Sequence, residues 1–142
     1  MIKIATTEDF SEVMEMAMKF ISSTDYAKYA DEQIVRNLIE TALTGAQNEM
    51  IILLIPGVGF LGGQTSPFAF GQHLLASEVA WWINEEQRKT GAGAELIEAF
   101  EYWAKNVAGC TIISLTSLDD NVGKFYEKKG YKLYERAYMK EI

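Results

Sequence analysis

Hydrophobic and polar positions change their period several times along the chain, and each change predicts a new element. Residues 1–5 alternate briefly, which predicts a first strand. Thr7 can cap a helix that ends near Ser22, and the apolar positions at helical spacing are Val13, Met14, Met16, Ala17 and Phe20. A second helix is predicted from about Asp31 to Leu43, before Gly45, with Ile34, Leu38, Ile39 and Ala42 on one side.

The middle of the chain has the pattern of strands. Residues 50–68 hold two apolar runs joined by a Pro56-Gly57 turn, which predicts a hairpin. The segment "ASEVAWWIN", residues 76–84, is rich in residues that favour strands and predicts a fourth one. A glycine-containing turn follows it.

Helices and strands alternate in the last third of the chain. Residues 93–109 predict a helix with one apolar face, and residues 110–117 predict a fifth strand. Residues 119–130 predict a short capped helix closed by Gly130, and residues 131–142 predict one or two final strands. The predicted order is β-α-α-β-β-β-α-β-α-β, with a further β at the end as an option. This order favours a single α/β domain, residues 1–142, with a mixed sheet between helices on both faces.

Composition and charge narrow the class of protein. Thirteen basic and twenty acidic residues give a net charge of -7, which opposes a nucleic-acid backbone or an anionic membrane and favours a cationic partner. The N-terminal residues turn acidic before any long apolar stretch, so neither a secretory signal nor a membrane span is predicted, and a cytoplasmic location is expected. The single Cys110 is expected to be a small buried residue of a strand.

The turn after the fourth strand has the chemistry of an anion site. The first N–H groups of a helix have no partner within the helix, and its dipole favours an anion there. A dinucleotide fingerprint requires a third glycine, where this chain has Leu96, and a P-loop requires a GK[ST] ending, which is missing. The pattern that does fit is R-x-x-G-x-G, formed by Arg88, Gly91 and Gly93.

With this pattern the sequence resembles the GNAT superfamily of acyl-CoA-dependent N-acyltransferases. The predicted order of elements is similar to that fold over nearly the whole chain. A second signature of the family is an Asn followed by an aromatic pair and a Gly-aromatic end, and "NVGKFYEKKGY" supplies Asn121, Phe125, Tyr126, Gly130 and Tyr131. The alternative is that both motifs serve packing and turn formation alone.

The resemblance implies where a coenzyme would bind. In the family the turn holds the pyrophosphate of coenzyme A, which here implies Arg88, Lys89, Thr90, Gly91, Ala92, Gly93 and Ala94. The fourth strand splays from the fifth and offers backbone groups to the pantetheine arm, here at Trp82 and Ile83, and Asn121 would also bind that arm. Glu85 and Glu86 are departures from the family pattern, and they should weaken the anion site unless they point outward.

The resemblance also implies the catalytic groups. An amine attacks the thioester directly to give a tetrahedral intermediate, which needs a base and an acid. Tyr126 matches the family's tyrosine acid. For the base we favour Glu78, because alternation would place Glu78, Ala80 and Trp82 on one face, although a solvated carboxylate at a strand end is the alternative. The lone His73 is expected to be incidental in its loop.

The acceptor site is expected between the first two helices, where members of the family often shape it. Candidates there are Asp25, Tyr26 and Tyr29, whose carboxylate and aromatic faces suit a cationic amine, although the tyrosines suit packing equally. One of Trp81 and Trp82 should face the core and the other the cleft.

The predicted function is transfer of an acetyl group from acetyl-CoA to a primary amine, without a metal. The sequence does not choose among a polyamine, an aminoglycoside, an amino-acid derivative and a protein amine. The rival is a non-catalytic acyl-CoA-binding or protein-interaction module of the same fold, and a nucleotide-binding domain is a weaker third. A homodimer is also predicted, because small domains of this fold often pair through sheet edges or helices, and the C-terminal segment could contribute such an edge.

Overall fold

A five-stranded mixed sheet forms the centre of the protein in the computed structural model, which describes residues 1–142. The strands are β1 (Lys3–Ile4), β2 (Met50–Ile55), β3 (Gly59–Pro67), β4 (Leu74–Ile83) and β5 (Ile112–Ser114), and they lie side by side in that order. The first four are antiparallel, and β5 runs parallel to β4. None of the helices is both long and apolar enough to cross a membrane.

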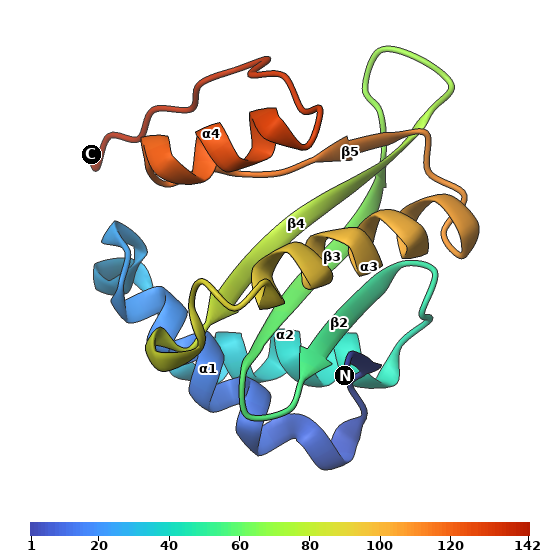
Figure 1. Cartoon of the computed structure of the whole chain (residues 1–142). Helices are drawn as coiled ribbons and strands as arrows, with labels where there is room; N and C mark the ends of the chain where they lie inside the picture. Colours follow the sequence, from blue (N-terminus) through green and yellow to red (C-terminus); the bar gives the residue numbers. More distant parts are fainter.

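Helices cover both faces of this sheet (Figure 1). The helices α1 (Phe10–Ser22) and α2 (Glu32–Thr44) lie on one face, while α3 (Ala92–Asn106) crosses the other and α4 (Asp120–Lys128) lies beside β5. Short 3-10 turns, η1 (Thr7–Asp9), η2 (Asp25–Tyr29) and η3 (Glu85–Gln87), occupy three of the connections. The predicted α/β fold is therefore confirmed. Because both faces are covered, β2 is a continuous apolar run and not an alternating one.

Two hydrophobic clusters hold the layers together. On the α3 side, Leu61, Leu96, Ile97 and Phe100 are completely buried, and Cys110 belongs to this cluster as predicted. On the other side, Val13 of α1 and Leu54 of β2 are completely buried. All the predicted apolar positions of the first helix except Phe20 are buried, whereas in α2 only Ile39 is, and Ile34 and Leu38 are exposed.

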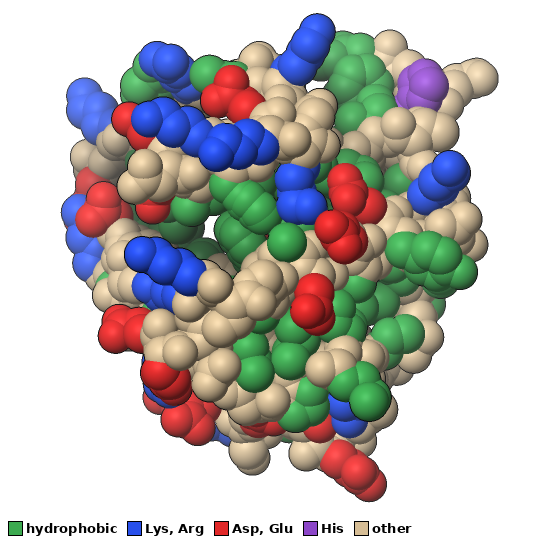
Figure 2. Space-filling view, viewed as in Figure 1, with side chains coloured by type: hydrophobic (Ala, Val, Ile, Leu, Met, Phe, Trp, Pro, Cys, Tyr) green, Lys and Arg blue, Asp and Glu red, His purple; other side chains and the backbone are tan.

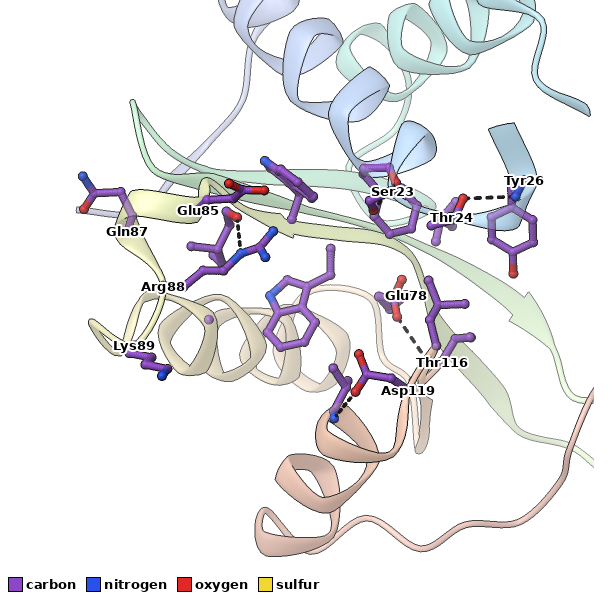
Figure 3. Close-up of a pocket in the computed structure, with 18 residues that line it drawn as sticks. Ser23, Thr24, Tyr26, Glu78, Glu85, Gln87, Arg88, Lys89, Thr116 and Asp119 are labelled. Carbon is purple, nitrogen blue, oxygen red and sulfur yellow. Dashed lines mark hydrogen bonds between the residues drawn. The ribbon is translucent and has the colours of Figure 1, made fainter. Parts of the chain in front are cut away.

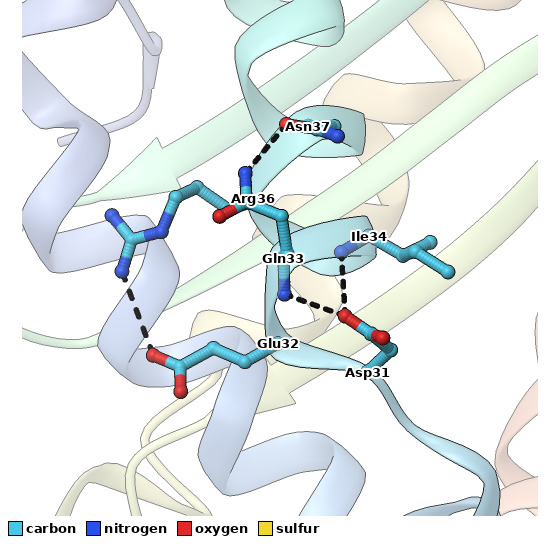
Figure 4. A network of polar contacts seen from close by, with 6 residues as sticks. All are labelled: Asp31, Glu32, Gln33, Ile34, Arg36 and Asn37. Carbon is cyan, nitrogen blue, oxygen red and sulfur yellow. Dashed lines mark hydrogen bonds and ion pairs between the residues drawn. The ribbon is translucent and has the colours of Figure 1, made fainter.

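The start of α2 shows the local signals that fix a helix end (Figure 4). The Asp31 side chain accepts hydrogen bonds from the backbone N–H groups of Gln33 and Ile34, so Asp31 is the N-cap. Within the first two turns, Glu32 pairs with Arg36 at 3.5 Å, and Gln33 donates to Asn37. The observed start at Glu32 agrees with the predicted start to one residue.

The C-terminal segment departs from the prediction. Residues 131–142 form no strand and are mostly exposed. The reason lies in the neighbouring edge, because β5 is only three residues long and offers few backbone groups for a ladder. Side chains hold the segment instead: Tyr131 donates to Glu101, Tyr134 bonds Ser114, and Glu141 pairs with Lys28. The sheet edge that we expected to form a homodimer is therefore not present in this segment.

A β-bulge in β4 changes which residues share a face. Gly62 pairs with Ala80 and Gly63 with Glu78, so Val79 is an extra residue without a partner on β3. Ala80 and Trp82 pack against the α1 and α2 cluster, but Glu78 bonds to Thr116, before α4. The prediction that Glu78, Ala80 and Trp82 lie on one face is therefore wrong, because the bulge breaks the alternation.

Candidate active site

The central feature of the site is the separation of two neighbouring strands. β5 pairs with β4 only from Leu75 to Ser77, although β4 continues to Ile83. Beyond Ser77 the outer edge of β4 has no strand partner, and a cleft of about 620 Å³ lies beside it. This volume is in the range of small-molecule sites. Figure 2 shows the hollow, with hydrophobic side chains in its wall.

The two ends of this cleft carry opposite charge (Figure 3). Arg88 and Lys89 line one end, with Glu85 and Gln87 and beside Gly93 at the start of α3, and we call Arg88 and Lys89 the basic end. Glu78, Asp119 and Tyr26 line the other part, with the hydroxyls of Ser23 and Thr24 and with Thr116, and we call this group the acidic end. A ligand that is anionic at one end and cationic at the other would match this distribution.

The start of α3 leaves its backbone N–H groups free. The residue at the N-cap is Gly91, which adopts a left-handed conformation with φ of 90°, and no side chain caps the helix. Lys89 is also left-handed, at φ of 68°, and is the one residue other than glycine with this conformation. Because the first amides of a helix lack partners within it, this end can bind an anion.

The second glycine of the pattern has a packing role. A Cβ added at Gly93 would lie 2.8 Å from Cζ2 of Trp81, so the helix could not approach β4 as it does. Trp81 in turn stacks on Phe125 of α4, with the ring centroids 5.8 Å apart. Gly93 therefore lets α3, β4 and α4 meet around one indole ring at the wall of the cleft.

Arg88 is held in a defined position. Its Nε donates to the carbonyl oxygen of Ile83 at 3.0 Å, and its guanidinium lies over the ring of Trp82, 4.7 Å from the centroid. Trp82 is fixed by a hydrogen bond from its Nε1 to Asn84. The terminal nitrogens of Arg88 keep their donors free, which suits a bidentate contact with a phosphate.

The predicted coenzyme residues do not all line the cleft. Those that do are Trp82, Ile83, Arg88, Lys89 and Gly93. Four predicted residues of the turn do not line the cleft, namely Thr90, Gly91, Ala92 and Ala94. Thr90 donates its hydroxyl to the carbonyl oxygen of Gln87, which closes the turn. Asn121 lies outside the cleft, in a separate surface hollow with Lys124 and Lys128 of α4 and with Lys129, the residue after α4.

Glu78 is an acidic side chain in an apolar wall. It is half-buried, and its Oε1 accepts the backbone N–H of Thr116 at 3.2 Å. Burial raises the pKa of Glu78 to about 7, and the bond from Thr116 opposes the rise in pKa only in part. A carboxyl group with this pKa exchanges protons near neutral pH, as a general base does.

Tyr126 lies deeper than a cleft residue. It is buried, and its hydroxyl donates to the carbonyl oxygen of Thr116 at 3.0 Å. Burial raises the pKa of Tyr126, and the nearby Glu78 raises this pKa further, so the phenol keeps its proton at neutral pH. Thr116 therefore binds both predicted catalytic groups, Glu78 through its N–H and Tyr126 through its carbonyl oxygen.

The three predicted acceptor residues are divided between two places. Tyr26 lines the acidic end of the cleft, with its ring projecting from η2. Asp25 and Tyr29 line a different surface hollow, against the C-terminal segment, where the Tyr29 hydroxyl donates to Glu141. His73 lies in the loop between β3 and β4, where its Nδ1 is 2.7 Å from the Thr111 hydroxyl, outside the cleft.

Several residues of the cleft were not predicted. Asp119 is the N-cap of α4, and its Oδ1 accepts the N–H of Val122 at 2.9 Å. An Asp before a helical segment is a recognisable cap signal, but nothing in the sequence tells that this cap also faces a cleft. Both Trp81 and Trp82 line the cleft from opposite faces of β4, whereas one alone was expected. The Trp81 Nε1 is buried without a hydrogen-bond partner.

Comparisons with known proteins agree with this fold. The protein has an α/β fold with a cleft beside a separated β4–β5 pair and an uncapped helix start. The acetyltransferase (GNAT) family model matches residues 16–131, so the chain belongs to this family and is a GNAT acetyltransferase. The acyl donors of the family are acyl-CoA molecules. A search of curated proteins found no match.

Solved structures share the fold at low sequence identity. An aminoglycoside 6'-N-acetyltransferase of Acinetobacter haemolyticus is 19% identical, with a TM-score of 0.76 over 100% of this chain and 99% of that one. A GNAT family acetyltransferase of Staphylococcus aureus is 20% identical, with a TM-score of 0.72 over 100% and 98%. A Bacillus halodurans protein is 17% identical, with a TM-score of 0.79 over 100% and 99%.

Proposed function

We propose that the protein transfers an acetyl group from acetyl-CoA to a primary amine. The observation that carries this proposal is the charge distribution of the cleft, with Arg88 and Lys89 at one end and Glu78 and Asp119 at the other. A pyrophosphate matches the basic end, and an amine that is cationic in solution matches the acidic end. The thioester would then lie between the two ends, along the unpaired edge of β4.

The basic end fits the coenzyme by its own chemistry. The uncapped amides at the start of α3 supply donors, and Arg88 supplies a charged fork that the Ile83 carbonyl and the Trp82 ring already orient. Little ordering is left to complete when the pyrophosphate binds, which favours affinity. Trp82 and Ile83, on the same strand edge, are the proposed neighbours of the pantetheine arm.

At the acidic end, Glu78 is the proposed base. The amine must lose a proton before or as it attacks the thioester carbonyl to give the tetrahedral intermediate. The pKa of Glu78, about 7, lets the carboxylate accept that proton and then release it to solvent near neutral pH. Its Oε2 has no partner in the protein, so this oxygen is free to face the amine directly or through a water.

Tyr126 is the proposed acid for the departing thiolate. Because its pKa is raised, the hydroxyl carries a proton throughout the neutral range. That proton is now donated to Thr116, so the hydroxyl must turn from this carbonyl toward the sulfur during the reaction. Replacement of Tyr126 with Phe should lower kcat about 10²-fold with an unchanged Kd for acetyl-CoA. A parallel fall in thermal stability without a change in kcat would assign Tyr126 a packing role instead.

Calorimetric titration with acetyl-CoA tests the proposal, followed by an amine screen that detects the released thiol. We expect micromolar binding that weakens when Arg88 is replaced with Ala. Lys105→Ala is the matched control, because Lys105 is a cation in the last turn of α3, outside the cleft. Absence of binding by a folded protein would contradict the donor site. Binding without turnover of any amine would favour a non-catalytic module.

A further inference from the structure

A second cavity adjoins the cleft on the other side of β4. It lies between the sheet and the helices α1 and α2, and its volume is about 230 Å³. Small residues leave the space open, namely Gly62 and Ala80 on the strands and Ala17 and Ala42 on the helices. Around Gly62 in particular, the nearest atom to an added Cβ is Phe60 Cε2 at 4.0 Å.

The lining of this cavity is almost free of polar groups. Of its 17 lining residues 15 are hydrophobic, and the other two are Gly62 and Gly63. The Tyr26 hydroxyl is the one polar side-chain group among them. A charged or hydroxyl-rich group would lose its hydration here without gaining hydrogen-bond partners, which is unfavourable. An apolar group gains from burial, and dry apolar cavities of similar size bind single aromatic rings.

The cavity and the cleft share a wall at the acidic end. Phe20, Tyr26 and Val79 line both spaces. Val79 is the bulged residue, directly after Glu78, so the junction lies one residue from the proposed base. A molecule with its nitrogen beside Glu78 could therefore extend past Val79 into the cavity.

The position of the cavity favours the acceptor over the donor as its occupant. The proposed donor path runs from the start of α3 along the edge of β4, beside Trp82 and Ile83, and neither of these residues lines the cavity. The cavity lies further along β4, at Val79 and Ala80, where Ala80 packs with α1 and α2. A group that fills it would therefore reach the proposed thioester position from the α1 and α2 side, where Phe20 and Tyr26 line both spaces.

We infer that the acceptor is a primary amine that carries an apolar group, either a short branched aliphatic chain or one aromatic ring, and that this cavity binds that group. The inference rests on the proposed function and narrows its substrate class. It disfavours polyamines and aminoglycosides, because their remaining groups are charged or rich in hydroxyls. Gly62 and Ala42 are then specificity-determining residues on opposite walls of the cavity.

The test compares two primary amines of similar basicity, 2-phenylethylamine and ethanolamine, with acetyl-CoA as donor. In the wild type we expect kcat/KM for 2-phenylethylamine to exceed that for ethanolamine by about tenfold or more. Gly62→Val should fill the cavity and lower the first value about tenfold while changing the second by less than about twofold. Ala42→Leu fills the cavity from α2 and should also lower kcat/KM for 2-phenylethylamine alone. Agreement between the two variants would show that the loss does not come from a folding defect in one of them. Gln64→Val, on the same strand but outside the cavity, is the control.

Other outcomes separate this inference from the proposed function. Equal turnover of the two amines, or an equal fall for both in Gly62→Val, would overturn the inference and leave the acetyltransferase proposal intact. Hexanoyl-CoA can also be supplied in place of acetyl-CoA as the donor. If Gly62→Val selectively lost turnover of hexanoyl-CoA, the cavity would bind the acyl chain of the donor, and the inference would be overturned. Titration of 2-phenylethylamine into the protein saturated with coenzyme A gives a readout without turnover. Binding that Gly62→Val abolishes supports the inference even if no amine is acetylated, and absence of binding overturns it.

Discussion

Two helices begin at the same cleft, and their first residues differ in one respect that decides what each can bind. α3 begins after Gly91, with no side chain on its amides, whereas α4 begins after Asp119, whose carboxylate accepts the N–H of Val122. Both helix dipoles favour an anion at these ends. At α4 the protein has supplied that anion itself, so α3 is left as the place for an anionic ligand.

The comparison shows that a helix start is not by itself an anion site. The flanking side chains increase the difference in charge between the two helix starts. Arg88 and Lys89 precede α3, whereas Asp119 and Asp120 lie at the start of α4. Glu78 adds a further carboxylate in the wall of the cleft near α4. The cleft is thereby polarised from one end to the other.

The largest effect is expected at the acidic end from Glu78→Gln. The amide keeps an oxygen for the Thr116 N–H but cannot accept a proton, so kcat should fall by about 10³-fold with little change in acetyl-CoA affinity. In the wild type, kcat/KM should rise with pH with a midpoint near the pKa of Glu78, about 7. This limb should be lost in the variant. A variant that keeps both its rate and its pH limb would remove Glu78 as the base.

The same variant has a second expected effect, on stability. The pKa of Glu78 rises from 4.5 in the unfolded chain to about 7 in the folded protein, so the folded state binds more protons between these values. Stability of the wild type should therefore fall as pH rises through this window, by about 3 kcal/mol. Glu78→Gln should be more stable than the wild type above about pH 7 and equal to it below about pH 4. Chemical denaturation at both pH values measures this.

At the basic end, Gly91→Asp would give α3 the carboxylate that α4 has. We expect acetyl-CoA binding to weaken about 100-fold, because a negative charge would lie at the site proposed for the pyrophosphate. Gly91→Asn is the matched control, since Asn has the same shape and tolerates the left-handed conformation equally, at φ of 90°. Calorimetry should give the Asn variant an affinity near that of the wild type. Equal losses in both variants would assign the effect to strain and not to charge.

The sequence predicted elements better than it predicted which residues meet. Each helix has its own periodic pattern and local caps, such as Asp31, so its position follows from neighbouring residues. The pairing of Glu78 with Thr116 depends on the bulge at Val79, and no signal in "ASEVAWWIN" reveals a bulge. The prediction of strands over residues 131–142 failed for a similar reason. A strand needs a partner edge, and β5 is too short to supply one.

The residues of the cleft show the same limit of prediction from sequence. Arg88 and Gly91 were found because their spacing along the chain is itself the pattern. Asp119 was missed because its role comes from the position of α4 across the cleft, and Asp25 and Tyr29 lie elsewhere because η2 presents only Tyr26 to it. Contacts across the sheet are set by the fold and not by local sequence.

A smaller effect is expected from Asp119→Asn, which sharpens the comparison by removing charge while keeping the cap. Asn is as good an N-cap as Asp, so the melting temperature should change little. The KM for a cationic amine should rise about fivefold, because one attraction at the acidic end is lost. Asp120→Asn is the control, since Asp120 is in the first turn of α4 but does not line the cleft. A similar KM increase in both variants would show that the total negative charge at the start of α4, and not the position of Asp119 in the cleft, attracts the amine.

The smallest effect is expected from Glu85→Gln, which tests the one acidic residue that lies within reach of the basic end. Glu85 lines the cleft with Arg88 and Lys89, whereas the adjacent Glu86 does not. Its charge opposes a bound pyrophosphate, but it is exposed and screened by solvent. Removing it should therefore tighten acetyl-CoA binding only about threefold, and the gain should shrink as salt is added. Glu86→Gln is the matched control, and an equal gain in that variant would show that net charge, and not position in the cleft, sets the affinity.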